Sequence, residues 1–385
     1  MAGRTSANCR NFFEKTGARR GGFSLVELVV VMVLMVIVMG VAASLLYGMI
    51  AMYQVTSDQT MARRRAQDVF NVLGVSLQNA GIGVPAGDFG YYFGAGYNGV
   101  SRPWGSDAFI SAWDSPVETS VNPLDASGGY GDVLKVVYSL PAGLKYEGAA
   151  AYAFSDENPE NTIAEGQTLK FIGASLDSVV DPGNPAGILP DKKGNVRSFI
   201  TFPGMDAHPL FVTAAKAGGD ELELTVSGVT PKSKDVSALF DGLARNVVRP
   251  YADLYLLKAS VAFVDDASTF YMLDVAESDP ADASLPEDPS ALPGFRVEGI
   301  KSIRFLPGQD KRQITVWVLA EGDIADSGRD EHSAAMSAIK SREFTYRNPD
   351  GDFETERLWE HVDFDDDAYY EDFFMTWRMR NVQID

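Results

Sequence analysis

An uninterrupted apolar run near the amino terminus constrains this 385-residue chain more than any other feature. Residues 28–47 read LVVVMVLMVIVMGVAASLLY and contain no charged side chain. At about 1.5 Å per helical residue, such a run spans roughly 30 Å, the thickness of the hydrocarbon core of a bilayer. The run therefore predicts one membrane-spanning helix, and the remaining chain is long enough to bury a sizeable soluble core.

Charge is distributed unevenly around this run. Residues 1–22 carry five basic side chains and one acidic side chain, whereas the remaining chain carries 28 basic and 52 acidic ones, a balance of −24. Because basic flanks are retained in the cytoplasm, we expect the amino terminus there and the chain after about Tyr53 outside. The acidic remainder repels polyanions, so nucleic acid is not an expected partner.

The chain contains few cysteine and histidine residues that could act as catalytic groups or metal ligands. The single cysteine, Cys9, lies in the basic end, which excludes intramolecular disulfides and thiolate zinc sites from the rest of the chain. His208, His332 and His361 are scattered, and no G-x-S-x-G, H-E-x-x-H or phosphate-binding loop motif occurs. We therefore expect no enzymatic activity, although a carboxylate pair of the glycosidase kind stays open, since separation in space is not readable from sequence.

Two kinds of processing signal compete for the amino-terminal segment. An ordinary secretory signal peptide would be cut near Val41-Ala42-Ala43. Glu27 argues against that interpretation, because an ionised carboxylate at the start of a membrane span costs on the order of 2 to 3 kcal/mol unless it is paired or lies near the interface.

Residues 19–28, RRGGFSLVEL, resemble the class III leader of type IV pilins and of the pseudopilins of type II secretion. The resemblance implies that a membrane-bound prepilin peptidase cuts after Gly22 and methylates the new amino terminus at Phe23. It also implies that Glu27, fifth after the cut, pairs with the amino-terminal amine of a neighbouring subunit in a growing fibre. Such a cation would satisfy a carboxylate that is costly to bury alone.

Small residues recur within the apolar run at Gly40, Ser44 and Gly48. Their spacing of four places them on one helical face, where another helix can approach closely. We interpret this face as an assembly surface, while noting that such repeats also arise by chance in membrane helices.

Helical periodicity continues beyond the apolar run and predicts an amphipathic extension as far as Ala80, where Gly81 and Pro85 supply stop signals. A helix over residues 23–80 would be roughly 87 Å long. The arginines at 63–65 are interpreted as a solvated face or as partners in intersubunit ion pairs. The apolar stripe of the extension consists of Ala66, Val69, Phe70, Leu73 and Leu77.

The rest of the chain predicts an α+β fold, in which an antiparallel β-sheet domain packs on the long helix in a pilin-like manner. Residues 81–131 are rich in glycine and aromatic residues and predict a long loop or insertion; the G-x-G-x-x-G match at 94–99 is attributed to chance because no helix follows it. Runs rich in β-branched and aromatic residues predict strands. They lie within 132–140, 168–173, 198–202, 210–214, 221–228, 252–276, 295–308, 313–322 and 372–383.

The order of four segments resembles the PilW group of minor pilins and, less closely, the J-type minor pseudopilins of type II secretion. These segments are ARRRAQDVFNVLGVSLQNAGIGVP, GDVLKVVYSL, VEGIKSIRFLPG and FFMTWRMRNVQ. The resemblance implies a single-pass inner-membrane protein that later joins a pilus or pseudopilus, with prepilin peptidase and other pilin subunits as partners. The expected organisation is a cleaved leader (1–22), a transmembrane assembly helix (23–53), its amphipathic extension (54–80), the glycine- and aromatic-rich insertion (81–131) and an extracytoplasmic β-rich domain (132–385).

Two further hypotheses concern ligands. The size of the soluble part and the aromatic stretch after Gly81 suggest an adhesin or ligand-binding module displayed on a pilin anchor. Asp350, Asp352 and Glu354 alternate along PDGDFETE and are candidate ligands for Ca²⁺, which prefers carboxylate oxygens. The segment lacks the spacing of an EF-hand loop, and the solvated face of an edge strand is the simpler interpretation, so no cofactor is expected.

Overall fold

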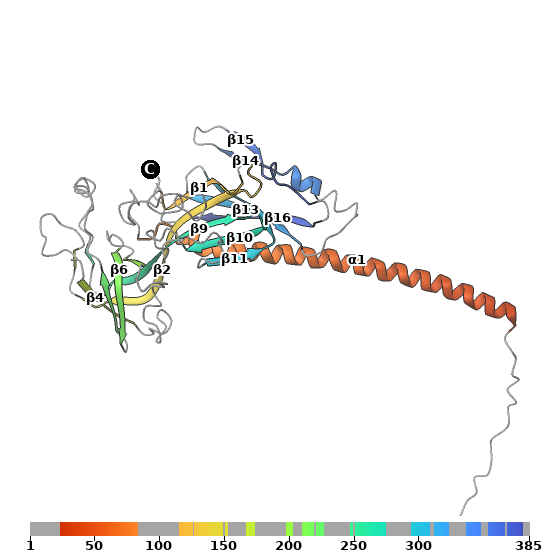
Figure 1. The fold of residues 1–385 in the computed structure, drawn as a ribbon, viewed down its shortest axis with the longest axis horizontal. Coiled ribbons are helices and arrows are strands. Elements are labelled where there is room, and N and C mark those ends of the chain that lie inside the picture. Colours follow the sequence, from red (N-terminus) through yellow and green to blue (C-terminus); the bar gives the residue numbers. More distant parts are fainter. Residues whose placement is uncertain are drawn as a thin grey trace, which may run out of the picture. The chain divides into compact units, whose positions relative to one another are not determined.

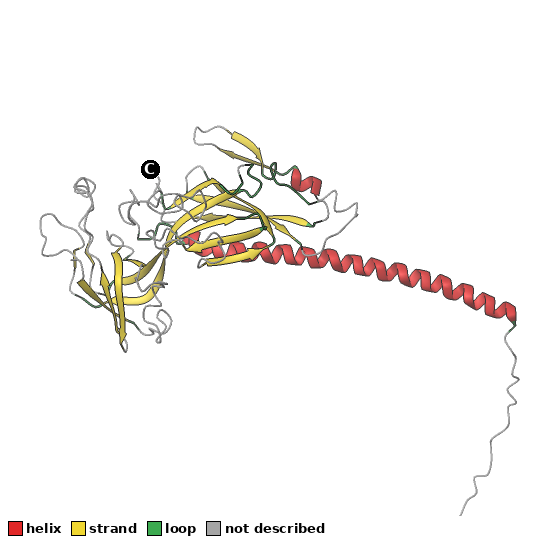
Figure 2. Ribbon diagram, in the orientation of Figure 1, coloured by secondary structure: helices red, strands yellow, loops and turns green. Residues whose placement is uncertain are grey.

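The computed structural model describes residues 24–83, 115–125, 127–148, 151–152, 167–173, 198–202, 210–218, 221–226, 247–248, 251–274, 294–308, 312–322, 336–347, 353–365 and 368–379. The chain divides into two units, residues 1–56 and residues 57–385. The fold is α+β, with one long helix and antiparallel sheets, as the sequence predicts (Figures 1 and 2).

The elements are α1 (Leu25–Gln78), β1 (Val117–Val121), β2 (Asp132–Tyr146), β3 (Ala151–Tyr152), β4 (Gln167–Ile172), β5 (Ser198–Thr201), β6 (Leu210–Gly218), β7 (Glu221–Val226), β8 (Val247–Val248), β9 (Asp253–Val264), β10 (Thr269–Asp274), β11 (Gly294–Glu298), β12 (Ile300–Pro307), β13 (Gln313–Glu321), β14 (Glu343–Arg347), β15 (Phe353–Arg357) and β16 (Tyr370–Arg378). A further helical turn covers residues 336–340.

The carboxyl-terminal part of α1 buries the predicted apolar stripe. Its five members are at most 7% exposed, and together with Ala62 they form what we call the buried stripe. The helix ends at Gln78, two residues before the predicted end, because Ala80 forms an antiparallel bridge to Tyr138. Gly81 then adopts a φ of 73°, a left-handed conformation that commonly follows a helix end.

Two sheets cover the buried stripe. One is the three-stranded antiparallel sheet β12-β13-β16, and the other is the part of the nine-stranded sheet formed by β2, β9 and β10. Phe70 of the stripe meets Trp377 of β16 with ring centroids 5.7 Å apart. The inward side chains share one core with the helix; examples are Leu134, Val136, Val264, Phe270, Ile303 and Val316.

The nine-stranded sheet closes on itself. Strand β2 pairs with β9 from Leu134 to Pro141 and also with β4 at Lys145 and Tyr146, so β2, β4, β7, β6, β5 and β9 form a closed cycle of antiparallel pairs. We call this cycle the ring; Figure 1 labels β2, β4, β6 and β9 among its strands. Every strand of the ring pairs with a neighbour on both sides, and the pairing of β2 with β4 consists of two residue pairs.

Side chains fill the inside of the ring. Leu169 of β4 lies opposite Leu224 of β7, and both are buried, whereas the neighbouring pair Lys170 and Glu223 points outward and forms an ion pair of 3.2 Å. This alternation follows from the two-residue period of a strand. The rings of Tyr146, Phe171 and Phe202 lie 5.9 to 6.2 Å apart in the same interior.

The strand pattern differs from the prediction in several places. Strand β2 does not end at Leu140 but continues to Tyr146, through a register irregularity between Pro141 and Lys145. The run at 295–308 is split into β11 and β12 by Gly299, and β1 lies inside the stretch predicted as a loop. Strand β15 agrees with the interpretation of Glu354 as part of the solvated face of an edge strand, whereas its partner β14 was not predicted.

Arg65 corrects the interpretation of the three arginines. Its guanidinium donates a hydrogen bond to the carbonyl oxygen of Glu321 and lies so close to Gly299 that a Cβ there would meet its Cζ at 2.5 Å. The interpretation as a solvated or intersubunit residue is therefore wrong for Arg65, which packs on the domain of its own chain. Arg63 and Arg64 are exposed.

A partly buried charge network joins the start of β2 to β12 and β15. Arg304 Nε lies 3.2 Å from Asp132 Oδ2, and Arg304 Nη2 donates to Glu356 Oε1 at 2.6 Å. The backbone N–H of Phe305 donates to the same Asp132 oxygen at 2.9 Å. Burial raises the pKa of Asp132 above its ordinary value, and Arg304 and the Phe305 N–H oppose that rise.

We expect Arg304→Met to destabilise the chain by about 3 kcal/mol at neutral pH, since it leaves a buried carboxylate without its cation. Asp132→Asn should cost less, because Arg304 keeps Glu356 as a partner. The Asp132 carboxyl favours the folded state below its unfolded pKa of about 3.9 and loses that contribution as the pH rises through its folded pKa. Removing Arg304 raises the folded pKa further, so the deficit should shrink as the pH falls towards about 4.

Denaturant unfolding of the full chain in detergent, followed by tryptophan fluorescence between pH 4 and 8, measures these differences. Lys170→Met, which removes the exposed ion pair with Glu223, is the matched control and should change stability little. A deficit in Arg304→Met that is independent of pH would contradict the assignment to Asp132.

Candidate functional site

A reciprocal pair of hydrogen bonds holds the first turn of α1. The backbone N–H of Ser24 donates to Glu27 Oε2 at 3.0 Å, and the backbone N–H of Glu27 donates to Ser24 Oγ at 3.2 Å. This is a capping box, which satisfies two of the backbone donors that a helix start leaves without partners. Glu27 thus has a local structural role, which our sequence reasoning missed although the S-x-x-E spacing signals it.

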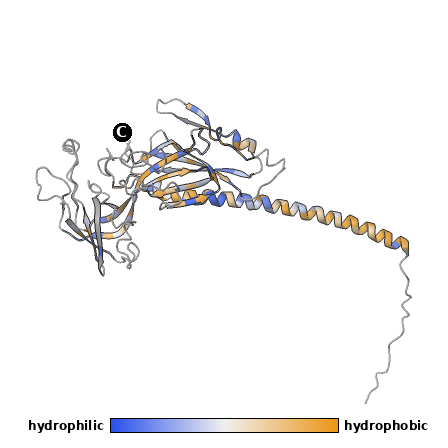
Figure 3. Ribbon diagram, viewed as in Figure 1, coloured by the Kyte–Doolittle hydropathy of each residue, from blue (hydrophilic) through white to orange (hydrophobic). Residues whose placement is uncertain are grey.

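The surface of α1 that follows Glu27 is apolar on every side. Every residue from Leu25 to Ile50 is exposed, and Figure 3 colours this part of the helix almost uniformly as hydrophobic. By length and composition α1 can cross a membrane. An apolar surface of this extent is not stable in water, so it requires lipid or neighbouring helices around it.

The predicted assembly residues lie on this exposed surface. Gly40, Ser44 and Gly48 are all exposed, and a Cβ added to either glycine would meet no atom within 4 Å. The two glycines therefore relieve no crowding among the described residues. Their role in close packing against another helix stays a prediction.

Several sequence candidates lie outside the described residues: the leader with Gly22 and Phe23, the match at 94–99, and Asp350 and Asp352. Glu354 lies on β15 and accepts a hydrogen bond of 2.8 Å from the Tyr346 hydroxyl, which raises the pKa of Tyr346. Among the described residues, no group of three or more His, Cys, Asp or Glu side chains is arranged to hold a metal ion. The calcium hypothesis therefore stays a prediction.

Comparison with known proteins places a recognised motif on this segment. A family model described as the prokaryotic N-terminal methylation motif matches residues 17–43, which include Gly22, Phe23, Glu27 and Gly40. Neither a search of curated proteins nor a search of solved structures found a match. The motif supports a type IV pilin-like protein, a pilin or pseudopilin precursor of the kind that prepilin peptidase processes. It fits membrane anchoring followed by assembly with other pilins, and a structural subunit rather than an enzyme.

Proposed function

We propose that this chain is a minor pilin, which is cut after Gly22 and then enters a type IV pilus or primes its assembly. The observation that carries the proposal is the methylation motif at 17–43 on a helix whose apolar surface is exposed from Leu25 to Ile50. Lipid would cover this surface in the membrane precursor, and helices of other subunits would cover it in the fibre. Transfer between two apolar surroundings avoids exposing the surface to water.

The proposed organisation follows from this function. Residues 1–22 would be the cytoplasmic leader, 23–53 the transmembrane assembly helix and 54–80 its amphipathic extension. Residues 81–131 would be an insertion, and 132–385 an extracytoplasmic pilin-like domain. The proposed partners are prepilin peptidase, the inner membrane and other pilin subunits.

Glu27 would bind the amino-terminal amine of a neighbouring subunit while it continues to cap its own helix. The hydrogen bond from Ser24 uses Oε2, and a carboxylate has about four acceptor positions on its two oxygens. The capping bond and a pairing cation are therefore compatible. Gly40, Ser44 and Gly48 would allow a neighbouring helix to approach on one face.

Mass spectrometry of the mature chain should find its amino terminus at Phe23, with an added N-methyl group. Gly22→Leu places a bulky residue at the cut and should yield only the full-length precursor. A mature chain that starts at Ser44 would contradict the proposal, because it would show cleavage of an ordinary secretory signal peptide after Ala43.

Glu27→Ala should leave membrane insertion intact and weaken or abolish incorporation into fibres, because it removes the charge that pairs with the neighbouring amine. Glu27→Gln is the matched variant, since a glutamine can also close a capping box but carries no charge. Immunoblots of sheared fibres and of the inner-membrane fraction measure the two steps. Wild-type incorporation of the Gln variant would show that Glu27 acts as a cap and not as a charge.

The match ends at residue 43, so it does not separate a minor pilin from a minor pseudopilin of type II secretion. Our preference for the minor pilins, and for the PilW group among them, rests on the order of the four segments along the chain. A pseudopilin would affect the export of folded proteins and leave surface pili unchanged. Loss of surface pili on deletion of the gene favours the pilin.

A second candidate function is display of an adhesin or ligand-binding module, and the ring favours it. The strands that complete the ring, β4 to β7, lie in sequence between Pro141 of β2 and Tyr255 of β9. The parts of β2 and β9 that cover the buried stripe, such as Leu134 and Ala262, lie before Pro141 and after Tyr255. Coverage of the helix therefore does not require the strands β4 to β7.

Replacing residues 143–253 with a short glycine-serine linker should leave incorporation intact and abolish adhesion, if the ring displays a binding function. Because Pro141 and Tyr255 are paired neighbours, a short linker joins the two cut ends. Fibre immunoblots and adhesion counts measure the outcome. Unchanged adhesion of fibres that contain the shortened chain would contradict the display function.

A further inference from the structure

We propose that β16 of one copy of this chain pairs with β11 of a second copy, so that an antiparallel ladder of backbone hydrogen bonds joins neighbouring subunits. The inference rests on the proposed entry into a fibre, in which subunits stand side by side, and it goes beyond the helix contacts proposed there. Both strands are labelled in Figure 1, and both belong to the unit of residues 57–385.

The outer edges of the two strands offer hydrogen-bonding groups. Among the described residues, β16 pairs with β13 alone and β11 pairs with β10 alone. No other backbone hydrogen bond joins either strand to a described segment. Each strand therefore carries a row of backbone N–H and C=O groups that a further strand can bind.

The side chains along these edges are apolar. Edge strands are usually protected by lysine, proline or a bulge, yet the nine residues of β16 include neither lysine nor proline. Phe374 and Met375 are 60% and 43% exposed although successive side chains point to opposite faces of a strand. On β11, Phe295 is 40% exposed. The simplest alternative, two edges that only face water, does not explain exposed phenylalanines on both strands.

The two edges lie on opposite flanks of α1. On one flank, a Cβ at Gly74 would lie 3.1 Å from Trp377 Nε1 of β16. On the other flank, the Ser76 hydroxyl contacts the sulfur of Met272 at 3.8 Å, and Met272 belongs to β10, the neighbour of β11. Gly74 and Ser76 are two positions apart, which is roughly 200° around a helix of 3.6 residues per turn. One copy therefore presents β16 on one side of its helix and β11 on the other.

Strand β16 runs in the same direction as α1. A side-chain hydrogen bond joins Tyr369, the residue before β16, to Gln59 of the helix. Eight residues further along the chain, Trp377 packs against Phe70. Sequence numbers therefore increase together along the strand and along the helix.

Strand β11 runs in the opposite direction. Phe295 lies opposite Met272, the residue that contacts Ser76. Gly299, which directly follows β11, lies against the guanidinium of Arg65. Sequence numbers therefore increase along β11 while they decrease along the adjacent part of the helix.

These directions select a second copy of the chain as the partner. Copies inserted in one membrane share one inside-to-outside direction, so β16 of one copy meets β11 of the next in antiparallel orientation. Contact of β16 with β16 would be parallel, and a parallel pair is slightly less stable per residue. The proposed contact joins two different surfaces, so it repeats from copy to copy and does not close after two subunits.

Disulfide cross-linking tests the pairing in membranes that contain the full chain. The chain has one cysteine, Cys9, so Cys9→Ser leaves no thiol. Thr376→Cys and Arg296→Cys then place thiols on exposed positions of β16 and β11. After oxidation with copper phenanthroline, the double variant should form a ladder of dimers, trimers and longer species on non-reducing gels. Each single variant should stay monomeric, and two differently tagged single variants expressed together should form a dimer that carries both tags.

Three control variants accompany this test. Glu360→Cys, exposed and outside both strands, replaces Thr376→Cys in the matched control and should give no ladder with Arg296→Cys. Met375→Lys, added to the double variant, places a charge on the edge and should reduce the cross-linked fraction about fivefold. Val121→Lys, at an exposed apolar position of β1, should leave that fraction unchanged. Tryptophan fluorescence checks the folding of each variant, and the thiol variants keep the test valid if Met375→Lys does not fold.

The outcomes separate the alternatives. A dimer of Thr376→Cys alone would overturn the proposal in favour of a symmetric contact. Cross-links to a different protein would overturn the choice of a second copy, and a folded double variant without cross-links would overturn the pairing itself. Mass spectrometry of the same membranes reports the amino terminus independently. A mature chain that starts at Phe23 but does not cross-link contradicts only this inference, whereas an uncut chain that cross-links contradicts only the proposed processing.

Discussion

Burial of one stripe of α1 is the interaction on which the unit of residues 57–385 depends. A helix that is apolar on one side needs a sheet to cover that side, and here two sheets share the task. Trp377 of β16 packs against Phe70, and Arg65 of α1 donates a hydrogen bond to the carbonyl oxygen of Glu321 in β13. At the amino-terminal part the same helix has no such stripe, because its apolar surface is continuous. One helix therefore combines two sequence patterns, each suited to a different apolar environment.

Local patterns explain how much of the fold was predictable. The buried stripe follows a 3.6-residue period and most strands follow a two-residue period, so both are readable from neighbouring residues. The ring was not predicted, because its closure depends on pairings such as Lys145 with Ile172. The proline and glycine after Leu140 indicate the end of a strand, yet β2 passes through them with an irregular register. Strand β14 was not predicted, because its alternating Phe344 and Tyr346 span only five residues.

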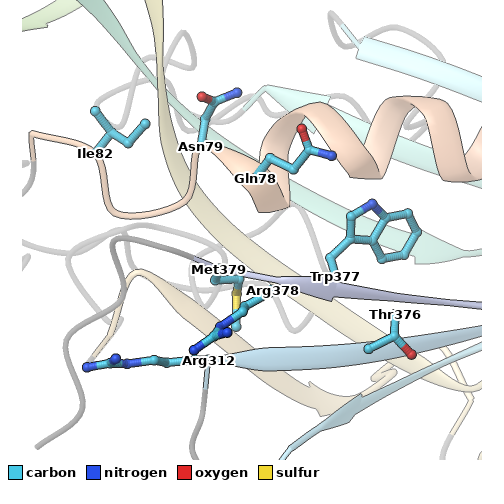
Figure 4. A pocket seen from close by; sticks show the side chains of 8 residues that line it. All are labelled: Gln78, Asn79, Ile82, Arg312, Thr376, Trp377, Arg378 and Met379. Carbon is cyan, nitrogen blue, oxygen red and sulfur yellow. The ribbon is translucent and has the colours of Figure 1, made fainter.

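The candidate sites also differ in whether they depend on neighbouring residues or on segments that are distant in the sequence. The leader motif and Glu27 lie within ten residues of each other, and a short window of sequence contains all that is needed to predict them. The capping box was equally local and was overlooked. The pocket lined by Gln78, Arg312 and Trp377 (Figure 4) could not be predicted from the sequence, because the end of α1 and the strands β13 and β16 meet there only after folding.

The continuity of β2 and β9 between the ring and the core has a mechanical consequence. Both strands cross from one body into the other, and their pairing runs unbroken from Leu134 to Pro141. A pull on the ring is therefore transmitted as tension along two covalent backbones. Because both backbones are pulled in the same direction, the hydrogen bonds between them carry little of the load, which passes to the core that packs on the buried stripe. A force on the ring would therefore reach the packed part of α1 through two paired strands and not through a single peptide segment.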